Sequence, residues 1–63
     1  MTMTQEEEII VFSLLAHRMR AKRKANKGES FMSFAKENIK YLKLMKRASP
    51  DLYNVEMRIL KKI

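Results

Sequence analysis

Clustered lysine and arginine side chains are the residues whose type and spacing first suggest chemistry in this chain. Eleven basic residues stand against two acidic ones between positions 18 and 47, in a 63-residue chain of net charge +7. Nucleic acids present closely spaced phosphates, and each phosphate contact releases condensed counterions, so clustered cations bind them with little geometric demand. We therefore predict phosphate contacts from ten side chains: Arg18, Arg20, Lys22, Arg23, Lys24, Lys27, Lys36, Lys40, Lys43 and Arg47.

The positive charge has other interpretations. A basic surface also attracts an acidic protein or an anionic membrane, and it can be a solvated face that keeps the protein in solution. Residues 31–47 are basic and amphipathic, as in helices that lie on membranes, but their apolar side is needed for the fold and the chain has no tryptophan. DNA and RNA are not distinguished, because no known binding module is present.

A second pattern suggests base recognition near the C-terminus. Asn54 and Arg58 are four residues apart and share one face of a helix, and these side-chain types pair bidentately with adenine and guanine edges. A helix-turn-helix would use residues 46–50 as its turn. The preceding helix is long for that motif and the turn has no glycine, which makes an exposed polar face the simpler interpretation.

Residues suited to catalysis or metal binding are few. His17 follows Ser13 by four residues, but a nucleophile also needs an orienting acid and an oxyanion site, and neither is recognisable. Residues 6–8 are glutamates, which point about 100° apart on a helix and converge poorly on an ion. We expect no enzyme activity, catalytic residue, metal, cofactor or small-molecule substrate.

The first element must carry the N-terminal half of the basic cluster. A helix over about residues 4–26 is predicted, because Thr4-Gln5-Glu6-Glu7 matches a capping box and Asn26 to Gly28 favours termination. The β-branched residues in Ile9-Ile10-Val11 leave a buried strand as the competing interpretation. Strong helix formers then continue without a turn residue as far as Asn26, which favours the helix.

This first helix is apolar on two faces. One stripe, expected in the core, contains Ile9, Phe12, Ala16 and Met19. The other stripe contains Ile10, Leu14 and Ala21. Because one neighbouring helix cannot cover both stripes, we predict that the second is a partner interface, either in a homodimer or with a larger protein that the chain docks on and inhibits.

Two further helices are predicted, over residues 31–47 and 50–62. Ser30 and Ser49 are suitable N-caps, and Pro50 suits the first helical position. Met19, Met32, Met45 and Met57 occupy apolar helical positions, where methionine fills gaps in a core. The short connections favour an all-α, three-helix single domain over residues 1–63.

Size and composition limit the class of protein. A chain of 63 residues has a small core, and it has no cysteine for a disulfide. The apolar run of residues 9–16 is far shorter than the roughly 20 residues that span a bilayer. We expect a cytoplasmic nucleic-acid-binding accessory or regulatory protein, with a protein-protein interaction module as the alternative.

Overall fold

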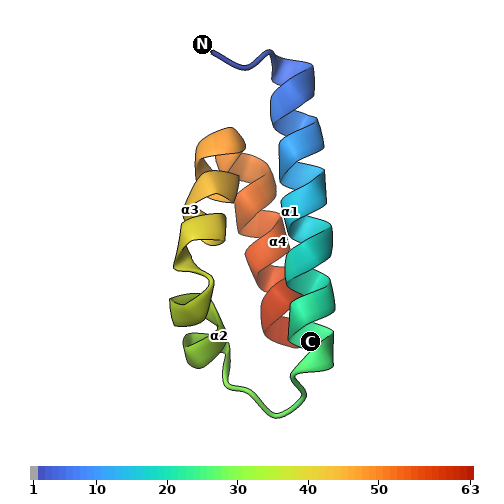
Figure 1. Ribbon diagram of the computed structural model, residues 1–63, viewed down its shortest axis with the longest axis vertical. Coiled ribbons are helices and arrows are strands. Elements are labelled where there is room, and N and C mark those ends of the chain that lie inside the picture. Colours follow the sequence, from blue (N-terminus) through green and yellow to red (C-terminus); the bar gives the residue numbers. More distant parts are fainter. Residues whose placement is uncertain (1) are drawn as a thin grey trace.

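The computed structural model, described here for residues 2–63, is an elongated bundle of helices measuring 38 × 17 × 16 Å. Its elements are α1 (Gln5–Ala25), α2 (Phe31–Glu37), α3 (Ile39–Ala48) and α4 (Pro50–Lys62). Helices α2 and α3 return antiparallel to α1, and α4 then runs in the same direction as α1 (Figure 1). The all-α prediction is confirmed, with no strand in the described part of the chain.

The predicted helix over residues 31–47 is two helices, so the three-helix count is wrong. Asn38 separates α2 from α3 with φ −114° and ψ 22°, and its side chain is buried. Its Nδ2 donates to the Phe34 carbonyl at 2.9 Å, and its Oδ1 accepts from Lys22 Nζ at 3.2 Å. A side chain that bonds to a carbonyl one turn earlier competes with the backbone ladder and bends the helix.

Apart from the break at Asn38, the predicted helix boundaries agree closely with those in the structure. Thr4 forms the expected capping box with Glu7, in which the Glu7 amide donates to Thr4 Oγ1 at 3.2 Å and the Thr4 amide donates to Glu7 Oε1 at 3.1 Å. Ser30 and Ser49 cap α2 and α4 through their hydroxyl oxygens. Gly28 has φ +92°, the left-handed region that glycine adopts without a Cβ penalty.

The core lies where all four helices meet, and α2 contributes Phe34 to it. Its buried apolar residues are Phe12, Ala16, Met19, Phe34, Leu42, Met45 and Leu60. The core prediction holds for Met19 and Met45, and Met57 packs at the core margin. It fails for Met32, which is exposed because it lies about 100° around α2 from Phe31.

Several predicted apolar positions are at the surface instead of in the core. Ile9 was expected in the core stripe of the first helix, yet it is about half exposed. Leu52 and Val55 of α4 are also exposed, because α4 turns the side bearing Glu56 and Leu60 inward. The side of α4 that carries Leu52 and Val55 therefore lies outside the core.

Candidate nucleic-acid interface

A row of basic side chains follows the outer face of α2 and α3. Its members are Lys36, Lys40, Lys43 and Arg47, and all four are exposed. Lys40, Lys43 and Arg47 are spaced three and four residues apart on one face of α3, with neighbouring Cβ atoms about 5–6 Å apart, and Lys36 lies in the last turn of α2, before the break at Asn38. Leu42 and Met45 are buried on the opposite side of α3, so the fold turns this row outward.

The row has little negative charge near it. Glu37 is the one acidic residue between positions 31 and 48, against five basic residues. Arg20–Glu56 is the only ion pair found within residues 2–63, so no member of the row is neutralised by a carboxylate there. The row is therefore a strip of uncompensated positive charge. We call Lys36, Lys40, Lys43 and Arg47 together the α2–α3 basic row. Lys46 is not a member.

Two cations of α1 lie beside this row, at the boundary between α1 and α3. Arg18 Cζ and Lys22 Nζ each lie 5.6 Å from the centroid of the Tyr41 ring, a cation–π distance. Tyr41 is half-buried and packs against the core, and it follows Lys40 directly on α3. The aromatic ring thus holds Arg18 and Lys22 next to the α2–α3 basic row.

Arg20 is bound within the protein. Its Nε and Nη2 each donate to one carboxylate oxygen of Glu56, both at 2.6 Å. The Glu56 side chain is 5% exposed and that of Arg20 is 43% exposed. The hydrogen bonds that Arg20 donates to the Glu56 carboxylate raise the pKa of Arg20 above its usual value. Arg20 keeps a solvent-facing edge, but its charge is compensated.

Arg23 lies in the core and is not available to a phosphate, which corrects the sequence prediction for this residue. It is 8% exposed, its Nε donates to the Leu60 carbonyl at 3.0 Å, and its Nη1 donates to the Glu29 carbonyl at 2.6 Å. Its guanidinium also lies over the rings of Phe31 and Phe34. The sequence contained a sign of this position, because Arg23 continues the buried stripe four residues after Met19.

The two remaining predicted ligands lie elsewhere. Lys24 and Lys27 are exposed, at the end of α1 and in the following turn. Lys24 comes two residues after Lys22 and therefore points about 160° away from it around α1. The structure thus groups six of the ten predicted residues and separates the other four.

The predicted base-reading residues are on a different surface. Asn54 and Arg58 are exposed on α4. Ser49 alone separates α3 from α4, whereas a helix-turn-helix has a turn of three to four residues. Base contact by Asn54 and Arg58 stays a prediction that rests on their residue types and spacing, without support from a helix-turn-helix motif.

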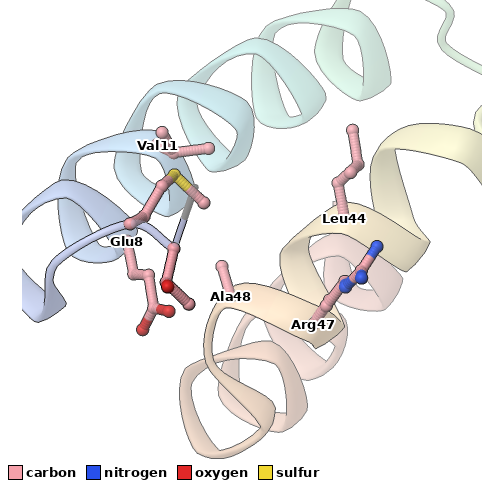
Figure 2. Close-up of a pocket in the computed structure, with 7 residues that line it drawn as sticks. Glu8, Val11, Leu44, Arg47 and Ala48 are labelled. Atoms are coloured by element: carbon pink, nitrogen blue, oxygen red, sulfur yellow. The ribbon is translucent and has the colours of Figure 1, made fainter.

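A shallow cleft of about 260 Å³ opens between the start of α1 and the end of α3. Figure 2 shows Val11 and Glu8 on α1 across from Leu44 and Ala48 on α3, with Arg47 at the α3 side. The lining is mainly apolar, and its charged groups are one carboxylate and one guanidinium. Arg47 therefore belongs both to this cleft and to the α2–α3 basic row.

A second groove, of about 410 Å³, follows the boundary between α1 and α4. Ser13 and His17, the pair considered for nucleophilic chemistry, line it together with the Arg20–Glu56 ion pair. Among residues 2–63, no cluster of three acidic, histidine or cysteine side chains could hold a metal ion. Within that range, none of the helices is long and apolar enough to cross a membrane.

Comparison with protein-family models, curated proteins and solved structures finds no match to this chain. Function must therefore be argued from the surfaces described above.

Proposed function

We propose that this protein binds nucleic-acid phosphates through the α2–α3 basic row, together with Arg18 and Lys22 of α1. The observation that supports this proposal is the row itself, four exposed cations along the consecutive helices α2 and α3 with no carboxylate partner. Phosphate contacts carry no base information, so binding is largely independent of sequence. That behaviour suits an accessory or regulatory factor.

The dimensions of the row fit a phosphate backbone. Lys40 and Arg47 of α3 are seven residues apart, which corresponds to about 10 Å at 1.5 Å per helical residue, and Lys36 in the last turn of α2 extends the row further. Duplex DNA places one phosphate per roughly 3.4 Å of axis on each strand, so this length passes several phosphates. Arg18 and Lys22 widen the surface toward α1, where a second strand or a bent single strand could be contacted.

The proposal is tested by fluorescence anisotropy with a labelled random duplex and a labelled single-stranded RNA, each at several salt concentrations. Six phosphate contacts predict a slope of log K against log salt of about −5 on duplex DNA. Charge reversal at Lys36, Lys40 and Lys43 should weaken binding to every sequence and make that slope shallower by about 3.

The matched control reverses three exposed lysines outside the proposed surface: Lys27, Lys61 and Lys62. It changes the net charge by the same amount, so a general effect of charge would appear in both variants. The expected result is a slope that changes mainly in the Lys36/Lys40/Lys43 variant. Equal effects of the two variants, or no binding by the unaltered protein at low salt, would contradict the proposal.

A further inference from the structure

The outward face of α1 carries a regular seam that no helix of the chain covers. Its members are Glu7, Ile10, Leu14, His17, Ala21 and Lys24, and all are exposed. Ile10 is 58% exposed and Leu14 is 67% exposed. The spacing alternates between three and four residues, as in helices that pack lengthwise on another helix. Helices α3 and α4 contact the other side of α1, where Phe12 and Met19 are buried.

The two ends of this seam have opposite charge. Glu7 lies in the first turn of α1 and Lys24 in the last turn, and neither takes part in an ion pair within the described residues 2–63. In the capping box, the Thr4 amide donates a hydrogen bond to Glu7 Oε1. Glu7 Oε2 takes no part in the capping box. The seam is therefore apolar at its centre, acidic at one end and basic at the other, which makes it complementary to itself in the antiparallel direction.

We propose that the partner of this seam is a second copy of the chain, with the two α1 helices packed antiparallel about a two-fold axis. Glu7 of each copy then faces Lys24 of the other. Ile10 faces Ala21 and Leu14 faces His17, so a large side chain meets a smaller or flatter one along the seam. A parallel pairing would bring Glu7 against Glu7 and Lys24 against Lys24, with repulsion at both ends.

The arrangement is isologous, because the same surface serves both copies and the seam of each copy is fully used by the other. It does not depend on nucleic-acid binding. The α2–α3 basic row is on other helices, and Arg18 and Lys22 of α1 are not members of the seam either. Loss of one property in a variant would therefore leave the other measurable.

Sedimentation equilibrium gives the first test. The unaltered protein should sediment at twice its chain mass of 7.5 kDa, and Leu14→Lys should reduce this to the single-chain mass. Leu14 is largely exposed, so the helical circular dichroism of the variant should be unchanged. Val55→Lys, at an apolar position of α4 that is 52% exposed, is the matched control and should leave the dimer intact. A monomeric unaltered protein, or a dimer insensitive to Leu14→Lys, overturns the proposal.

Charge exchange tests the orientation. Glu7→Lys and Lys24→Glu should each raise the dimer dissociation constant about tenfold, because each converts two attractive pairs into repulsive ones. The double variant re-forms both pairs with reversed sign, so it should restore association to near the original value. The double variant still lacks the capping hydrogen bond between the Thr4 amide and Glu7. Recovered association would therefore come from the restored charge pairs between the two copies. Additive weakening in the double variant overturns the antiparallel pairing.

Cross-linking tests the register. The chain has no cysteine, so introduced thiols are unique. A mixture of Ile10→Cys and Ala21→Cys proteins should form the mixed disulfide in preference to either symmetric one. Dominance of the symmetric Ile10→Cys product would show parallel packing and overturn the proposal.

Discussion

At the scale of single residues, the fold uses two of its arginines in opposite ways. Arg23 has no carboxylate partner among its hydrogen bonds and is satisfied by two backbone carbonyls and two aromatic rings. Arg20 instead neutralises Glu56, which is the more buried member of that pair. Because Glu56 is more buried than Arg20, replacing Arg20 and replacing Glu56 should change the free energy of unfolding by different amounts.

Arg20→Met should cost about 2 kcal/mol in the free energy of unfolding, because it leaves the Glu56 carboxylate buried without a partner. Glu56→Met should cost less than about 1 kcal/mol, since the exposed Arg20 guanidinium can return to water. Urea denaturation of both single variants and the double variant measures this. The double variant should be at least as stable as Arg20→Met. A larger cost for Glu56→Met than for Arg20→Met would contradict the prediction that the unpaired Glu56 carboxylate causes the loss of stability.

At the scale of the elements, side chains that bond to nearby backbone decide where the helices begin and bend. Asn38 interrupts the helix although the apolar pattern continues across it. Phe34 before the break and Leu42 after it are both buried. Ser30, Ser49 and Thr4 satisfy amides that the first helical turns leave free. Each of these effects is local.

The capping box of α1 should weaken in acid. The Thr4 backbone amide, followed by the Thr4 side chain, lowers the pKa of Glu7 below its usual value of 4.5. A carboxyl group with a lowered folded-state pKa stabilises the fold above 4.5, and that contribution is lost as the pH falls through the folded-state pKa. Carbon-13 NMR should therefore place the Glu7 midpoint below 4.5.

Thr4→Ala provides the comparison, because it removes the hydroxyl that completes the box. The Glu7 midpoint should move up toward 4.5 in this variant. A midpoint at or above 4.5 in the unaltered protein would mean that the box does not form in solution.

At the scale of the whole molecule, a small core supports two separate exposed surfaces. The seven buried apolar residues form one cluster to which all four helices contribute. Domains below about 70–80 residues rarely exceed roughly 3–5 kcal/mol of stability from a single core. The apolar seam of α1 and the α2–α3 basic row both lie outside this cluster, so they can be altered without removing core contacts.

Leu60→Ala should show how narrow this margin is. Leu60 is fully buried, and truncation of a buried leucine costs about 2–5 kcal/mol. That range equals most of the expected stability, so the variant should be largely unfolded by circular dichroism at 25 °C. Val55→Ala, at an exposed site, should change the free energy of unfolding by less than about 0.5 kcal/mol. A cooperatively folded Leu60→Ala protein would show that the core is not limiting.

The sequence by itself determined the features that depend on neighbours along the chain. The helical class, the caps at Thr4, Ser30 and Ser49, and the termination near Gly28 follow from local hydrogen bonding and backbone preference. Within the α2–α3 basic row, the shared face of Lys40, Lys43 and Arg47 follows from helical periodicity, which places residues three and four apart on one face.

The tertiary structure alone decided which of the competing apolar and charged positions are buried. Asn38 is a core residue because Lys22 of another helix reaches its amide, and that contact has no counterpart in the local pattern. Arg23 enters the core because two carbonyls and two rings from α2, α4 and the turn after α1 converge on it. Periodicity defines the faces of a helix, but the packing of other helices selects the face that is covered. That selection removed Arg23 from the basic surface and left the α1 seam exposed.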